Sequence, residues 1–129
     1  MRAVDTNVLV RLLTRDDATQ AAAADAFVSS GAWVSHVVLI ESMWVLDSVY
    51  ELSHEQIALA IEMLLDHREL ALQDPDVVGA ALERYRKRPK LGFSDCMVVE
   101  IARKAGHLPL GTFDRRLAKL DGAELVERG

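Results

Sequence analysis

Short apolar segments alternate with longer amphipathic segments along the whole chain, which is typical of strands and helices in alternation. Strands are expected at residues 2–5, 32–34, 70–72, 108–112 and 124–126, and helices at 8–13, 18–28, 36–51, 54–66, 76–87, 94–104 and 114–120. This order predicts an α/β fold, in which helices flank both faces of a central parallel sheet of about five strands.

Polar residues at the ends of these segments support several of the predicted boundaries. Ser35 is a good N-cap for the helix that follows it, and Ser53-His54-Glu55-Gln56 has the pattern of a capping box. Either Ser94 or Asp95 opens the helix that runs to Lys104, and Gly106 is its expected C-cap. No repeat or linker marks a boundary, so residues 1–129 are expected to form one domain.

Composition places the chain among globular proteins. Half of the 129 residues are apolar, and the longest unbroken apolar run is the segment 57–61, which is too short for a membrane span. Charged and polar residues also interrupt the first segment, so no signal peptide is expected. The single cysteine, Cys96, cannot form an internal disulfide, which fits a cytoplasmic protein.

The net charge of −5 argues at first against a nucleic-acid partner, but the charges are unevenly distributed. Residues 41–83 carry ten acidic side chains and one basic, whereas residues 84–129 carry eleven basic and six acidic. The segment 84–90 alone has five cations in seven positions. This segment is either a solvated helix end or a patch that contacts phosphates.

Acidic residues follow the predicted strands at points where ligands of parallel sheets usually bind. Asp5 follows the first strand, Asp114 follows the fourth, and Asp95 stands at the beginning of a helix. Glu41 lies within an apolar helix that is expected to be buried, where a carboxylate must be protonated, paired or bound to a metal. The alternative is a position at the rim of the helix that reaches water.

Four carboxylates at one edge require a cation, and ligands that are all oxygen select Mg²⁺ or Mn²⁺ over zinc. The four histidines lack zinc-ligand spacing and are expected at the surface, and the chain has neither a G-x-S-x-G elbow nor a glycine-rich phosphate loop. A carboxylate-held divalent ion activates water and neutralises a phosphodiester under attack. Together with the basic segment, these acids indicate a nuclease.

With these residues the sequence resembles the PIN-domain ribonucleases of the VapC toxin type. The resemblance covers the whole chain and is carried by four motifs in order: Val4-Asp5-Thr6-Asn7 at the start, Glu41 in the third helix, Phe93-Ser94-Asp95, and Gly111-Thr112-Phe113-Asp114 near the end. Cys96 and Ser94 stand where alanine is expected, and neither change removes an acid.

The resemblance implies a Mg²⁺- or Mn²⁺-dependent endoribonuclease with a PIN-like fold. Its implied catalytic and metal-binding residues are Asp5, Glu41, Asp95 and Asp114, with Thr6, Asn7 and Thr112 supporting the pocket. The implied partners are RNA, a second copy of the chain in a homodimer, and a cognate VapB-type antitoxin that covers the site. The basic residues are outside the family's motifs, so RNA binding is inferred from their charge alone, for Arg84, Arg86, Lys87, Arg88, Lys90 and Arg115.

Two other functions remain open at this stage. A receiver-like signalling domain has a similar length and an acidic Mg²⁺ pocket, but it needs an acidic pair at the end of the first strand, where this chain has Asp5-Thr6-Asn7. The second alternative function is that of a PIN fold that binds RNA without cutting it. A dehalogenase-type phosphatase requires D-x-D, which Asn7 breaks.

The helix at 36–51 carries more apolar side chains than one face can bury. Met43, Trp44, Val45, Leu46 and Val49 are therefore expected to contribute to a dimer or antitoxin surface, with core packing as the alternative.

Overall fold

The computed structural model describes residues 1–127 of the chain. Residues 1–75 form one compact unit, the N-terminal unit, and residues 76–129 form a second, the C-terminal unit. Within the described residues, no helix combines the length and apolarity needed to cross a membrane.

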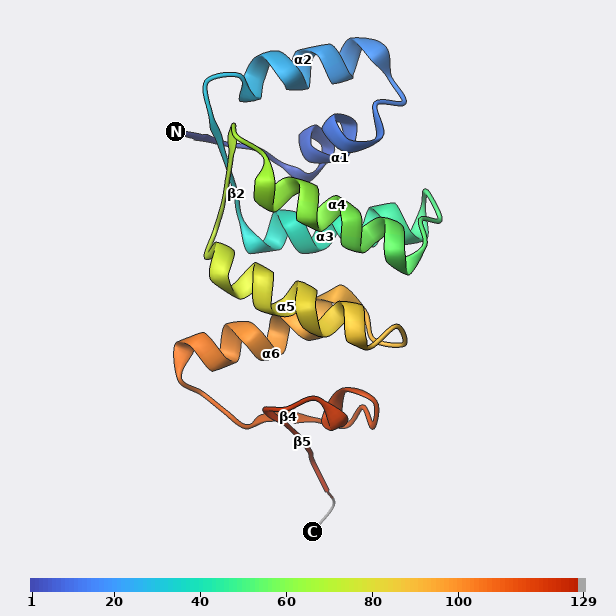
Figure 1. Cartoon of the computed structure of the whole chain (residues 1–129), viewed down its shortest axis with the longest axis vertical. Coiled ribbons are helices and arrows are strands. Elements are labelled where there is room, and N and C mark those ends of the chain that lie inside the picture. The colour runs from blue at the N-terminus through green and yellow to red at the C-terminus, as the bar shows by residue number, and fades with distance from the viewer. Residues whose placement is uncertain (128–129) are drawn as a thin grey trace. The chain divides into compact units, whose positions relative to one another are not determined.

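The N-terminal unit contains a parallel three-stranded ladder with two helices between successive strands (Figure 1). Its elements are β1 (Arg2–Ala3), α1 (Thr6–Thr14), α2 (Ala18–Val28), β2 (Ala32–Val34), α3 (His36–Ser48), α4 (His54–Asp66) and β3 (Leu70–Leu72). The strand order is β1-β2-β3, with Arg2 opposite Ala32 and Ala32 opposite Leu70. The carboxyl ends of all three strands therefore lie at the same edge of the ladder.

Helix α1 packs against both α2 and α3, and the aliphatic side chains between these elements form the core of this unit. The largest fully buried members are Leu9, Val34, Leu39, Leu46, Ile61 and Leu64. Local capping fixes where the helices begin. Ser35 accepts a hydrogen bond from the Val38 amide, and Ser53 forms both halves of a capping box with Gln56.

A polar network joins the C-terminal ends of α1 and α3. The Arg11 guanidinium donates to Tyr50 Oη at 2.8 Å and to Asp16 Oδ1 at 3.1 Å, and the Tyr50 hydroxyl donates to Asp16 Oδ2 at 2.8 Å. The hydrogen bond from Tyr50, then that from the Thr14 hydroxyl, and finally the positive charge of Arg11 hold the pKa of the Asp16 carboxyl below its usual value. The network fixes the chain where it turns from α1 toward α2.

The C-terminal unit contains two antiparallel helices and a parallel two-stranded ladder. Its elements are α5 (Pro75–Lys87), α6 (Phe93–Ala105), β4 (Leu110–Thr112), the 3₁₀ helix η1 (Leu117–Lys119) and β5 (Ala123–Leu125). Lys104, near the end of α6, pairs with Asp76 at the beginning of α5 at 3.0 Å, and the Tyr85 and Phe93 rings meet edge to face at the other end. Figure 1 shows these two helices side by side, with β4 and β5 next to α6.

The prediction of a single sheet of about five strands needs correction. Residues 1–127 contain five strands that all pair in parallel, but they form ladders of three and two strands rather than one sheet of about five. The strands are only two or three residues long, so their apolar pattern carries little information about which strands are neighbours.

Several predicted boundaries also need correction. Strand β1 ends at Ala3, before Asp5, and α3 ends at Ser48 rather than at residue 51. Helix α6 begins at Phe93 with Gly92 as its N-cap, so neither Ser94 nor Asp95 opens it. The expected helix at 114–120 is the three-residue η1, β4 begins at Leu110, and β5 spans Ala123–Leu125. The segments Ala18–Val28, Ala32–Val34, His54–Asp66 and Leu70–Leu72, and the C-cap at Gly106, are confirmed.

Candidate active site

Asp5 is held at the beginning of α1 by the backbone of that helix. Its backbone is extended, and its Oδ1 atom accepts a hydrogen bond from the Val8 amide at 3.1 Å. This is N-cap geometry, in which the positive end of the helix dipole also favours a carboxylate. The Asp5 Oδ2 atom accepts no hydrogen bond from residues 1–127, so it remains open to a ligand.

Glu41 is exposed, so the prediction that it is buried within an apolar helix is wrong. Helix α3 buries one face through His36, Leu39, Ser42, Met43 and Leu46. At about 100° per residue, Glu41 lies on the opposite face, with Val37 one turn before it and Trp44 one turn after it. These two neighbours are 74% and 64% exposed, which explains why the local sequence is apolar while the carboxylate still reaches water.

Asp95 and Asp114 are brought together within the C-terminal unit. Asp95 lies half-buried in the first turn of α6, and Asp114 is exposed two residues after β4. Burial, and then the negative charge of Asp114, raise the pKa of Asp95, while a hydrogen bond from the Gly92 backbone partly opposes the rise. The two carboxylates are therefore close enough to repel each other.

Thr112 and two backbone amides determine how Asp114 is presented. The Thr112 hydroxyl oxygen accepts the Asp114 amide at 3.0 Å, which fixes the turn after β4. Asp114 Oδ1 then accepts the amides of Arg116 at 2.8 Å and Leu117 at 3.2 Å, at the entrance to η1. Asp114 Oδ2 accepts no hydrogen bond from the described part of the chain. Thr112 is thus a positioning residue for Asp114.

The carboxylates of Asp95 and Asp114 fit a hard divalent cation by their chemistry. They are paired oxygen donors whose mutual repulsion a cation would relieve, and neither is neutralised by a lysine or arginine among residues 1–127. Over the same residues, no three His, Cys, Asp or Glu side chains form a group that could hold a metal ion. Asp5 and Glu41 belong to the N-terminal unit, so their participation with this pair stays a prediction.

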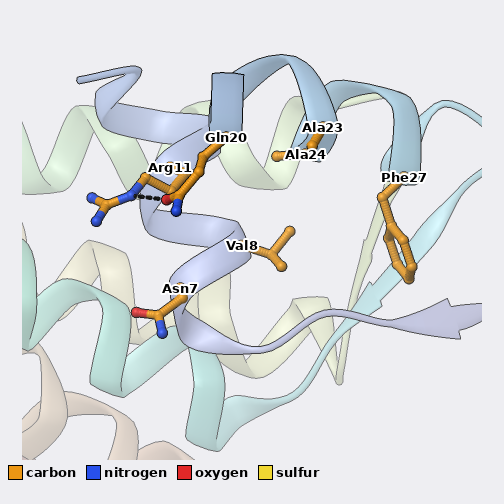
Figure 2. Close-up of a pocket in the computed structure, with 7 residues that line it drawn as sticks. All are labelled: Asn7, Val8, Arg11, Gln20, Ala23, Ala24 and Phe27. Carbon is orange, nitrogen blue, oxygen red and sulfur yellow. Dashed lines mark hydrogen bonds between the residues drawn. The ribbon is translucent and has the colours of Figure 1, made fainter. Parts of the chain in front are cut away.

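Thr6 and Asn7 lie in the first turn of α1, directly after Asp5. Thr6 is half-buried, whereas Asn7 lines a mostly apolar cavity of about 330 Å³ between α1 and α2. Figure 2 shows Asn7 and Arg11 at one side of this cavity and Phe27 at the other, with Arg11 Nε donating to Gln20 Oε1 at 2.6 Å. The expected support of an acidic pocket by Thr6 and Asn7 stays a prediction.

The basic residues divide into those with internal partners and those without. Arg84 approaches Asp121 at 3.9 Å, and Lys87 approaches Glu83 at 3.5 Å. Arg88 and Lys90 are exposed in the turn after α5 and form no ion pair with the described residues. Arg86 is exposed on α5, and Arg115 is exposed next to Asp114, beside a cavity of about 720 Å³ that is also lined by Phe113 and Val126.

Two features of this region were not found by sequence reasoning. His36, expected at the surface, is buried, and its amide and its Nε2 atom both hydrogen-bond to Gln73, directly after β3. Ser42, next to Glu41, is fully buried, and its hydroxyl has no partner in the part of the chain that the structure describes. The neighbouring sequence does not predict the burial of either side chain, because that burial depends on which face of α3 packs against the core.

The family model of the PIN domain matches residues 2–123, which is nearly the whole chain. The chain belongs to the PIN domain family. No curated protein and no solved structure matches it. PIN domains are typically nucleases and generally use divalent metal ions. The family match therefore agrees with the resemblance carried by the four motifs, and a pair of carboxylates suits a metal-using nuclease. Membership of the family also points to RNA as the substrate.

Proposed function

We propose that this PIN domain is a Mg²⁺- or Mn²⁺-dependent endoribonuclease that hydrolyses RNA phosphodiester bonds. The observation that carries the proposal is the pair Asp95 and Asp114, whose negative charges repel each other and which have no lysine or arginine partner among residues 1–127. Backbone amides fix the position of Asp114. A receiver-like domain is less favoured, because the PIN family model accounts for residues 2–123 and the first strand leads to only one acid, Asp5.

The four carboxylates would share the work of the proposed site. Asp5, Asp95 and Asp114 would hold the metal ion, and the water-exposed carboxylate of Glu41 would complete the metal site and orient the attacking water. A bound Mg²⁺ or Mn²⁺ would lower the pKa of that water and offset the charge that develops on the phosphodiester. Thr6, Asn7 and Thr112 would shape the pocket around the first and last of these acids.

The proposed partners are those implied by the resemblance to VapC-type PIN-domain ribonucleases. We propose that residues 1–129 act as one PIN-like domain, that it forms a homodimer, and that it is the toxin of a VapBC-type module located in the cytoplasm. Exposed apolar side chains on α3 and α4 support a protein partner: Val37, Trp44, Leu59 and Met63 are each more than half exposed. Met43 and Leu46, expected to contribute to such a surface, are instead buried in the core.

Two observations would test these partners. A monomer at micromolar concentration in light scattering would contradict the dimer. A short upstream reading frame encoding a DNA-binding protein would support the toxin role.

The catalytic assignment is tested by cleavage of an end-labelled single-stranded RNA in the presence of Mg²⁺ or Mn²⁺. The variants Asp5→Asn, Glu41→Gln, Asp95→Asn and Asp114→Asn are each expected to lose at least about 100-fold in rate, more than is usual for residues that only orient a metal ligand. Asp66→Asn, which removes one exposed acid from the end of α4, is the matched control and should retain wild-type activity.

Undiminished cleavage by Asp95→Asn or Asp114→Asn would contradict the carboxylate mechanism. Tight RNA binding by the wild-type chain without cleavage under either metal would instead favour a PIN domain that binds RNA without cutting it.

A further inference from the structure

A basic pocket of about 320 Å³ lies within the C-terminal unit, between the turn after α5 and the 3₁₀ helix η1. Its lining brings together two segments that are about 25 residues apart in the sequence. The pocket's cations are Lys87, Arg88 and Lys90 from the first segment and Arg116 and Lys119 from the second. Sequence reasoning identified only the first segment, because nothing local indicates that η1 completes the pocket.

Four of the five cations of this pocket lack an ion-pair partner among residues 1–127, and the fifth, Lys87, approaches Glu83 at 3.5 Å on the exposed surface of α5. Arg103 pairs with Glu100 at 3.2 Å, and Lys104 pairs with Asp76. By contrast, Arg88, Lys90, Arg116 and Lys119 are exposed and form no ion pair with any of residues 1–127. Like charges that converge on one concave surface without an internal counter-ion favour binding of an anion from outside.

Both walls of the pocket continue directly into the acidic pair. Leu91 lines the pocket and is followed by Gly92, the N-cap of α6, which carries Asp95 in its first turn. On the other wall, the backbone amide of Arg116 donates to Asp114 Oδ1 at 2.8 Å. The chain that builds the basic pocket therefore also positions the two carboxylates.

We propose that this pocket binds backbone phosphates of the RNA strand next to the phosphodiester that is cut. The proposal rests on the proposed ribonuclease function and names the surface that holds its substrate. Lysine and arginine contacts to phosphate position a strand without reading its bases, so the pocket contributes affinity and register but no sequence preference. Arg84 is not part of this surface, because it approaches Asp121 instead.

The test measures binding of a fluorescein-labelled single-stranded RNA of about 12 nucleotides to the full-length chain, by anisotropy in EDTA so that no cleavage occurs. The double variant Arg116→Ala/Lys119→Ala is expected to weaken binding at least fivefold. It should also reduce the slope of log K against log salt by about 1.4, since each lost phosphate contact on a single strand contributes about 0.7.

The matched control is Arg68→Ala/Lys104→Ala, which removes two cations outside the pocket. It is expected to retain the wild-type slope. Circular dichroism melting of each variant verifies that its fold is intact. Equal affinities and slopes for the pocket variant and the control would overturn the proposal. So would displacement of the RNA by millimolar inorganic phosphate at constant ionic strength, which would assign the pocket to a small free anion.

Kinetics separate this inference from the proposed function. Where the wild-type chain cleaves RNA, the pocket variant should raise KM at least fivefold and leave kcat within about threefold, because it removes uniform binding and not chemistry. A fall in kcat with unchanged KM would overturn the proposed role. If the wild-type chain binds RNA but cleaves none, the nuclease function fails, while the binding comparison still decides the role of the pocket.

Discussion

Two aspartates of the candidate site are each placed by hydrogen bonds from the protein backbone at the entrance to a helix. Asp5 accepts the Val8 amide, and Asp114 accepts the amides of Arg116 and Leu117. This arrangement fixes each carboxylate without a side-chain cation, which would compete with a metal ion. The sequence predicted that Asp5 and Asp114 follow strands, and each lies two residues after a strand, because the same local sequence forms both the turn and the cap. Their role in a metal site stays a prediction.

Glu41 could not be placed in the same way. The apolar residues around it indicate only that some face of α3 is buried, not which one. The buried face is set by contacts with α1 and α4, which are distant in the sequence. The prediction that Glu41 is buried was therefore wrong. Its apolar neighbours Val37 and Trp44 lie on the same exposed face of the helix and are themselves exposed to solvent.

Asp16 provides a test of the polar network at the ends of α1 and α3. Its pKa is lowered mainly by the hydrogen bond from Tyr50, so the unfolded chain takes up the proton first as the pH falls. The stability that the network contributes is therefore present above about pH 4, the usual value for Asp, and is lost as the pH falls through the lower folded pKa. Asp16→Asn and Tyr50→Phe should be less stable than wild type at neutral pH.

That difference should shrink in acid, which urea unfolding monitored by circular dichroism between pH 3 and pH 7 would measure. Parallel loss of stability in wild type and both variants over this range would show that Asp16 is not linked to folding.

At the scale of the elements, side chains that cap their own helix were the most informative sequence signals. Ser53 and Gln56 specify the beginning of α4, and Gly106, with a φ of 83°, ends α6 in the left-handed conformation that glycine tolerates best. The end of α3 lacked such a signal, because Glu51 adopts a φ of 55° that its identity does not predict. Strand pairing was similarly hidden, since segments of two or three residues fit many partners.

The capping box of α4 allows a quantitative test. Ser53→Ala removes the acceptor of the Gln56 amide, which lies at 3.2 Å, whereas the backbone amide of residue 53 that donates to Gln56 Oε1 is retained. The expected loss is about 1 kcal/mol in the free energy of unfolding, measured by urea denaturation.

Ser48→Ala is the control for this change. It removes an equally exposed hydroxyl that donates to the Trp44 carbonyl within α3, and it should change stability by less than about 0.5 kcal/mol. Equal effects of the two substitutions would contradict a specific capping role for Ser53.

At the scale of the whole molecule, charge follows the division into two units. Residues 1–75 carry twelve acidic and four basic side chains, whereas residues 76–129 carry eight acidic and eleven basic. A net charge of −5 therefore does not oppose an RNA partner, because the cations gather in the unit that also holds Asp95 and Asp114. The sequence could predict the uneven charge and the PIN family, but neither the division into two compact units nor the five cations that line one pocket.

The central claim is that a carboxylate site of this PIN domain cleaves RNA only with a divalent cation bound. The most direct measurement is the cleavage rate of one single-stranded RNA by the purified chain, first with EDTA and then with Mg²⁺ or Mn²⁺ restored, beside the Asp95→Asn variant. Activity should disappear with EDTA, return with either metal in the wild-type chain, and remain absent in the variant. Cleavage that persists in EDTA, or an Asp95→Asn variant as active as wild type, would contradict the claim.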